Sequence, residues 1–133
     1  LMLYSSMIVG YTKGVISEKD AAYMVYDYCR DARKFFGERA AVSLGVTSTG
    51  VLGDEPTYEC PSRMLGDIGA AKAAGMSDIA IYNLEGILKS DNPEEWFEIL
   101  LRARAEMPES SPKVIFMRNS IKIGDRLLGL LYT

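Results

Sequence analysis

Apolar segments of strand length alternate along this chain with segments in which apolar residues recur at helical spacing. We expect buried strands over residues 2–9, 40–46, 79–84 and 114–117, with a helix between each pair and about thirty residues per unit. The strands are continuous apolar runs rather than alternating ones, which is typical of a parallel sheet covered on both faces. The pattern therefore predicts an α/β fold of four βα units with parallel strands.

Local signals mark where the helices begin. Ser17 is followed three residues later by Asp20, which is the spacing of a capping box. Pro61 and Pro93 each occupy the first-turn position that proline favours in a helix. We expect one more short helix over residues 121–131.

The composition fits a single α/β domain over residues 1–133. The chain is 48% hydrophobic and 25% charged, which is ordinary for a globular protein. Its net charge is −3 and its basic residues form no block, so we expect no nucleic-acid partner. The apolar runs fall short of the ~20 residues of a membrane span, so we expect none. The chain begins at Leu1 and ends on an apolar stretch, which indicates a piece of a longer protein.

The chain has no histidine, which excludes Ser-His-Asp and Cys-His nucleophile systems and histidine metal ligands. Its two cysteines, Cys29 and Cys60, lack zinc spacing, and Cys29 falls on the apolar side of a predicted helix, as a reduced core thiol does. No EF-hand spacing supports a hard cation among the acidic residues. We therefore expect no metal and no cofactor.

Residues 66–82 resemble the helix-to-strand passage of (β/α)8 barrels, with an Ala-rich helix, an Ala-Gly stop and a buried strand. The resemblance is greatest to barrels of the glycoside-hydrolase kind, and residues 3–6, 53–56 and 84–86 add to it. Four βα units are half of such a barrel, so the resemblance implies the C-terminal half of a TIM-type barrel. A small open flavodoxin-like sheet is the alternative.

A carboxylate follows the third expected strand directly, at Glu85. Ligands and catalytic groups gather at the C-terminal ends of parallel strands. Glycoside hydrolysis uses two carboxyl groups, about 5–5.5 Å apart for retention or 6.5–9.5 Å for inversion. Asp54 or Glu55, in the long irregular loop expected over residues 47–59, is the candidate partner of Glu85. Alternatively, Glu85 caps a helix or pairs with a lysine, and the other two lie in a solvated turn.

Other side chains near the expected strand ends are candidates for substrate binding. Aromatic rings stack on the apolar faces of sugars, and three tyrosines have suitable positions: Tyr4, Tyr58 and Tyr82. Tyr82 and Asn83 point to opposite sides of the strand, so only one of them faces the site. Arg118 and Asn119 follow the fourth expected strand and are candidates for binding an anionic or hydroxylated ligand.

The resemblance implies a glycosidase-like hydrolase acting on a carbohydrate through paired carboxylates. The alternative is a non-catalytic α/β module for binding a small molecule or for assembly. A lyase or aldolase is less favoured because Lys72 and Lys89 lie outside the expected strands. An open sheet edge invites association, so we expect a homo-oligomer.

Overall fold

The computed structural model describes residues 1–47 and 53–131, with side chains as far as Gly124. Its elements follow the order β1 (Met2–Leu3), α1 (Ser5–Tyr11), α2 (Glu18–Phe36), a 3-10 turn (Gly37–Arg39), β2 (Ala41–Gly45), α3 (Pro61–Ala73), β3 (Asp78–Tyr82), α4 (Leu84–Leu88), α5 (Pro93–Arg102) and α6 (Pro112–Leu131). Part of the expected loop, residues 48–52, lies outside the described residues.

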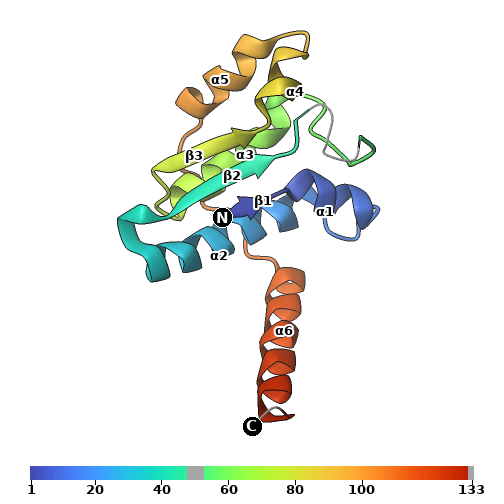
Figure 1. Ribbon diagram of the computed structural model, residues 1–133, viewed down its shortest axis with the longest axis vertical. Coiled ribbons are helices and arrows are strands. Elements are labelled where there is room, and N and C mark those ends of the chain that lie inside the picture. Colours follow the sequence, from blue (N-terminus) through green and yellow to red (C-terminus); the bar gives the residue numbers. More distant parts are fainter. Residues whose placement is uncertain (48–52, 132–133) are drawn as a thin grey trace.

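The three strands form an open parallel sheet in the order β1-β2-β3. Met2 is in register with Ser43, and Ala41 is in register with Asp78. Helices α2 and α3, which connect the strands, both lie behind the sheet in Figure 1. The α/β class and the parallel pairing are therefore confirmed.

The core lies between this sheet and the two connecting helices. Val42 and Leu44 of β2 are buried there, while Ser43 between them is only half-buried. Small residues on α3, such as Ala71, let that helix approach α2 closely, and Cys29 of α2 is a fully buried free thiol. The predicted reduced core cysteine is thus confirmed.

Local signals placed the helix boundaries well. The Ser17 side chain accepts a hydrogen bond from the Asp20 N–H at 3.2 Å, and the Asp20 carboxylate accepts one from the Ser17 N–H at 2.9 Å, so the capping box is present. Pro61 and Pro93 each open their helix, α3 and α5. Gly75 stands just beyond α3 with a φ of +87°, a left-handed conformation that glycine adopts at little cost.

The strand expected over residues 2–9 was wrong, because β1 ends at Leu3 and Ser5–Tyr11 is helical. Beyond Leu3, Gly45 is the last residue of the partner strand β2 with which β1 could have continued to pair. The Ser6 hydroxyl donates to the Gly45 carbonyl at 3.2 Å and accepts from the Val46 N–H at 3.0 Å. The Ser6 side chain thus binds the backbone groups that would have continued the pairing of β1 with β2. The chain continues as helix α1 instead.

The strand expected over residues 114–117 was also wrong, since these residues belong to α6. The Ser111 hydroxyl accepts a hydrogen bond from the Val114 N–H at 3.2 Å, and Pro112 follows the serine directly. Serine before a first-turn proline is a helix start. The sheet therefore has three strands among the described residues instead of four, while the helix expected over 121–131 is confirmed as part of α6.

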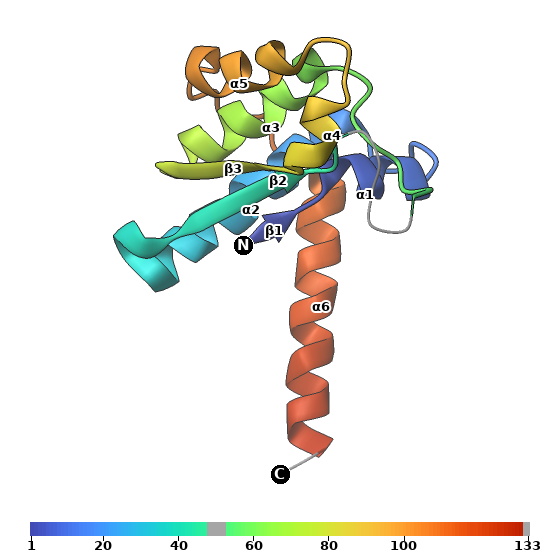
Figure 2. The ribbon, with the colours of Figure 1, turned by 45° about the horizontal axis from the view of Figure 1, so that its top comes forward.

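Helix α6 extends away from the rest of the molecule in Figures 1 and 2. Its first turns are fastened to α2. The Arg118 guanidinium donates to the carboxylates of Asp27 and Asp31, the latter at 2.7 Å, and lies 4.5 Å from the centre of the Tyr28 ring. None of the helices in the described part of the chain has the length and apolar character to cross a membrane.

Replacing Leu44 by alanine should lower the free energy of unfolding by about 2–5 kcal/mol, because Leu44 is fully buried and the smaller side chain leaves a cavity. Leu101→Ala is the matched control, since Leu101 is 86% exposed, and should change stability by less than about 0.5 kcal/mol. Urea unfolding measures both variants. Equal losses in the two would contradict the placement of the core.

Candidate functional site

A cavity of about 540 Å³ opens between α1, α2, α3 and residues 56–59. Its buried part is lined by Ser5, Tyr58 and Asp67, which are all less than a tenth exposed. Its rim carries charged side chains, among them Glu18 and Arg63. The volume falls within the range of about 300–1,000 Å³ that is usual for small-molecule sites.

Three buried polar side chains meet at the inner end of this pocket. The Ser5 and Tyr58 hydroxyls both donate to Oδ2 of Asp67, and the two hydroxyl oxygens lie next to each other. We refer to Ser5, Tyr58 and Asp67 as the buried polar cluster. It joins α1, the segment after the long loop and α3, which are distant in the sequence.

Each member of the cluster is positioned by the secondary-structure element on which, or next to which, it lies. Ser5 is the first residue of α1, immediately after β1. Tyr58 pairs beside the end of β2, where its N–H donates to the Val46 carbonyl at 2.9 Å and it bridges to Thr47. Asp67 lies on α3 among the buried positions of that helix. Two of the three members therefore stand beyond the C-terminal ends of parallel strands.

Burial controls the protonation of the cluster. Removal of Asp67 from water raises the pKa of its carboxyl, while the hydrogen bonds from Ser5 and Tyr58 act in the opposite direction and nearby Glu18 adds to the rise. Burial, and then the proximity of Asp67, raises the pKa of the Tyr58 hydroxyl. The site thus favours a neutral carboxyl beside a neutral phenol.

The charges at the rim are paired with one another. The Arg63 guanidinium donates to the Glu18 carboxylate at 2.9 Å and to the Glu59 carboxylate at 2.8 Å. Lys19 lies 3.6 Å from the Glu109 carboxylate. These groups are exposed, so the pairs add little to stability. The rim residues that line the pocket itself carry two negative charges, on Glu18 and Glu59, and two positive charges, on Lys19 and Arg63.

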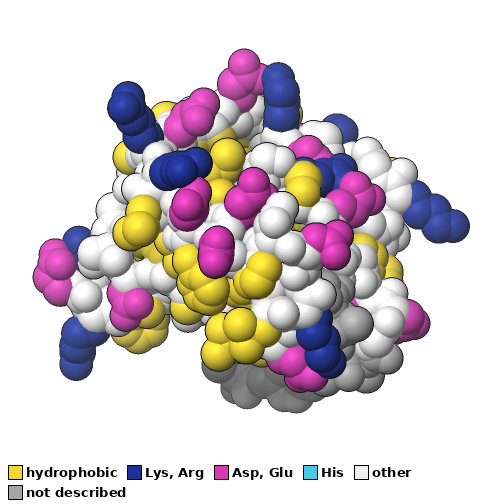
Figure 3. Space-filling view, turned by 90° about the horizontal axis from the view of Figure 1, so that it is seen from above, with side chains coloured by type: hydrophobic (Ala, Val, Ile, Leu, Met, Phe, Trp, Pro, Cys, Tyr) yellow, Lys and Arg dark blue, Asp and Glu magenta, His cyan; other side chains and the backbone are white. Residues whose placement is uncertain are grey.

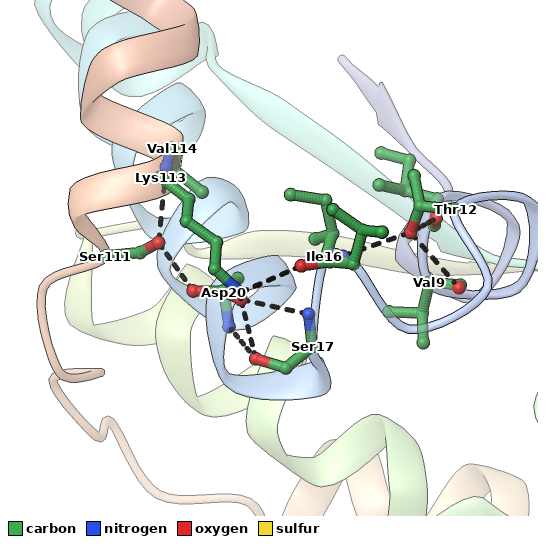
Figure 4. A network of polar contacts seen from close by, with 10 residues as sticks. Val9, Thr12, Ile16, Ser17, Asp20, Ser111, Lys113 and Val114 are labelled. Atoms are coloured by element: carbon green, nitrogen blue, oxygen red, sulfur yellow. Dashed lines mark hydrogen bonds and ion pairs between the residues drawn. The ribbon is translucent and has the colours of Figure 1, made fainter.

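A second network fixes the start of α2, which forms one side of the pocket. Figure 4 shows the Asp20 carboxylate between the Ser17 backbone, the Ser111 hydroxyl and the Lys113 ammonium. The hydrogen bond from Ser111, at 2.6 Å, is the main cause that lowers the pKa of Asp20. The network ties the start of α6 to the start of α2.

The structure places Glu85 in the first turn of α4. Its side chain is exposed, and its carboxylate accepts a hydrogen bond from the Lys89 ammonium at 2.6 Å, which lowers the pKa of Glu85. Glu55 accepts a hydrogen bond from the Gly53 N–H at 2.9 Å, and Asp54 lies beside it. None of these three carboxylates lines the pocket of the buried polar cluster.

Two of the tyrosines predicted to bind substrate lie together. The centroids of the Tyr4 and Tyr82 rings are 5.6 Å apart; Tyr4 directly follows β1, and Tyr82 is the last residue of β3. Gly45 lies between them, and a Cβ there would come within 2.7 Å of the Tyr82 carbonyl oxygen and 3.3 Å of the Tyr4 ring. A side chain at this position would therefore collide with the Tyr82 backbone and crowd the Tyr4 ring.

The remaining predicted binding residues have structural contacts. The Asn83 side chain caps α4 by accepting a hydrogen bond from the Gly86 N–H at 2.6 Å. Arg118 holds α6 against α2, and Asn119 is the next, exposed residue of that helix. Because residues 114–117 are helical, neither Arg118 nor Asn119 stands at a strand end.

Sequence reasoning missed Ser5 and Asp67 as site residues. Asp67 had a signal, because it falls beside Met64, Ile68 and Ala71 on the apolar side of its helix. An acidic residue on a face that is otherwise apolar requires a partner. Ser5 gave no such signal, because it lay inside an expected strand.

No protein family, characterised protein or solved structure that was compared with this chain matches it. Among residues 1–47 and 53–124, no group of three or more acidic or cysteine side chains is placed to hold a metal ion. On the face seen in Figure 3, Lys and Arg side chains are interspersed with Asp and Glu. The pocket chemistry is therefore the basis for assigning a function.

Asp67→Asn should remove a pH-dependent component of stability. In the unfolded chain Asp67 ionises around its ordinary pKa of 3.8, whereas in the folded chain its pKa is raised. Folding then takes up a proton between these two pKa values, so the free energy of unfolding of the wild type should fall, relative to that of the variant, as pH rises through this window.

Urea unfolding of both proteins between pH 3 and 8 measures this difference. Below the unfolded pKa the contribution of Asp67 should be fully present, and above its folded pKa it should be lost. Asp78→Asn, at an exposed position, is the matched control and should follow the wild type. A difference between wild type and Asp67→Asn that is constant with pH would contradict the raised pKa.

Proposed function

We propose that this chain is an α/β binding module that takes a small, neutral, hydroxylated molecule, such as a sugar or a polyol, in the pocket beside Asp67. The observation on which this rests is the buried polar cluster at the inner end of a cavity of suitable size. A buried carboxyl in a pocket is a common mark of a functional site.

Hydroxyl groups make up half of the polar side chains that line the pocket: Ser5, Ser6, Thr57, Tyr58 and Ser62. A hydroxyl both donates and accepts hydrogen bonds, so such a lining suits a ligand whose own groups do the same. The lining also has apolar members that fit the carbon skeleton of the ligand: Val9, Ala21, Ala22 and Pro56. The combination matches a sugar or polyol.

The charge balance favours a neutral ligand. Among the residues that line the rim, two acids, Glu18 and Glu59, are matched in number by two cations, Lys19 and Arg63. Both cations are already engaged in ion pairs. Burial moves Asp67 toward its neutral form. A neutral molecule enters without breaking these pairs, whereas an anion would meet Glu18 and Glu59.

Gly66→Leu should abolish binding while preserving the fold. Gly66 lines the pocket, and a Cβ at this position would have no atom within 4 Å. Leucine has a higher helix propensity than glycine, so the variant should fold. Isothermal titration with D-glucose, myo-inositol and glycerol should show binding of at least one probe by the wild type and loss of that binding in the variant.

Gly124→Leu is the matched control, because Gly124 is also helical, has equally open space and does not line the pocket. It should bind as the wild type does. Binding that survives Gly66→Leu would place the ligand elsewhere, and failure of every probe to bind the wild type would refute the proposal.

A glycosidase-like hydrolase is the second candidate. It is supported by the three carboxyl groups that line one pocket, those of Asp67, Glu18 and Glu59, of which only Asp67 is buried. A buried acid and an exposed carboxylate are the pair that glycoside hydrolysis requires. The assignment of Glu85 with Asp54 or Glu55 as the catalytic pair stays a prediction beside it.

The half-barrel architecture also stays a proposal. It is supported by the strand order β1-β2-β3 and by the placement of α2 and α3 on one face, as in consecutive units of a (β/α)8 barrel. Among the described residues, no strand pairs with the outer edge of β3. Association with a second copy through this open edge is the corresponding proposal for assembly.

Turnover of 4-nitrophenyl glycosides tests the hydrolase directly. If Asp67 is the general acid, Asp67→Asn should lower kcat by about 10²–10⁴-fold. Glu85→Gln should do so instead if Glu85 is catalytic, and unchanged turnover in that variant would remove Glu85 from the mechanism. No turnover by the wild type would refute the hydrolase and leave the binding module.

A further inference from the structure

We propose that Asp67 is the specificity-determining group of this pocket and recognises its ligand by donating the carboxyl proton to a ligand oxygen, which couples binding to pH. The inference rests on the proposed function, because it concerns the same pocket and the same class of neutral ligand. It adds that Asp67 is the donor in its hydrogen bond to the ligand, and that the affinity for the ligand depends on pH.

The geometry of the cluster assigns this direction. Ser5 and Tyr58 both donate to Oδ2 of Asp67, so that oxygen already accepts two hydrogen bonds. In a neutral carboxyl the proton is then held by Oδ1. Asp67 lines the cavity, so a ligand oxygen that enters is a suitable acceptor for that proton.

The charged and titratable groups around Asp67 leave its carboxyl without a counter-ion. Helix α1 contributes hydroxyls, and α2 contributes Glu18, Cys29 and Lys19, whose ammonium lies 3.6 Å from the Glu109 carboxylate. The segment after the loop contributes Tyr58 and Glu59. The nearest cation of α3, Arg63, is bound to both glutamates. The positive charge of Arg63, which would favour ionisation of Asp67, is thus already neutralised by the two glutamates.

Neither of the two buried titratable groups that act on Asp67, Cys29 and Tyr58, changes charge near neutral pH. Burial raises the pKa of the Cys29 thiol to about 12, and it raises the pKa of the Tyr58 hydroxyl as well. Glu18, Glu59 and Arg63 are exposed and paired. A pH dependence of binding that disappears with Asp67 therefore reports on Asp67 itself.

The sign of the pH dependence identifies the chemistry of the ligand. A neutral ligand that accepts the Asp67 proton binds the protonated protein, so its affinity falls when pH rises above the pKa of Asp67 in the free protein. A ligand with an ammonium group would bind the ionised carboxylate, and its affinity would rise with pH instead. The two classes of ligand are distinguished by whether the affinity falls or rises as pH increases.

The test measures the dissociation constant of the tightest of D-glucose, myo-inositol and glycerol between pH 4.5 and 8.5. For the wild type the constant should rise by about tenfold per pH unit once pH exceeds the pKa of Asp67. Asp67→Asn, whose amide still donates a hydrogen bond, should bind with one affinity throughout. Asp78→Asn should reproduce the wild-type slope.

Proton uptake provides a second measurement that needs no variant. Titration of the wild type in buffers of different ionisation enthalpy should show that binding takes up a fraction of one proton at a pH above the pKa of Asp67. Binding without uptake and without a slope would overturn this inference and leave the proposed function standing. Affinity that rises with pH would also overturn it, and no binding at any pH would refute both.

Discussion

The arrangement of this protein depends on one buried carboxyl, Asp67, and on the two hydroxyls that bind it. An isolated carboxylate in the interior costs far more free energy than a neutral acid. Ser5 and Tyr58 offset part of that cost with hydrogen bonds, and burial raises the pKa of Asp67. The same bonds join α1, α3 and the segment beside β2, so the cluster both closes the fold on this side and forms the end of the pocket.

The position of the pocket follows from the parallel sheet. Ser5 comes directly after β1, and Tyr58 pairs where β2 has ended, so both stand at the carboxyl edge of the sheet. Ligands of open α/β sheets bind at this edge. The early end of β1 is part of the arrangement, because the helix that replaces the longer strand carries Ser5 and Ser6 into the pocket.

Features fixed by neighbouring residues could be predicted from the sequence, and those fixed by distant residues could not. The capping box at Ser17, the proline starts of α3 and α5 and the buried strand β2 all follow from local patterns. The end of β1 depends on a contact between Ser6 and Gly45, and α6 begins at a serine that also binds Asp20, 91 residues away. The site itself joins Ser5 to Asp67 across 62 residues. Glu85, Asp54 and Glu55 were predicted because catalytic groups gather at the ends of parallel strands. The buried acid of the pocket, Asp67, lies instead on a helix.

The most direct test of this account is the titration of the Asp67 side chain, followed by its carboxyl ¹³C resonance and assigned by the loss of that signal in Asp67→Asn. A buried, neutral Asp67 should titrate with a midpoint clearly above the ordinary value of 3.8. A midpoint at or below that value would show an ionised carboxylate in the pocket. It would contradict the neutral, proton-donating Asp67 on which the proposed ligand recognition depends.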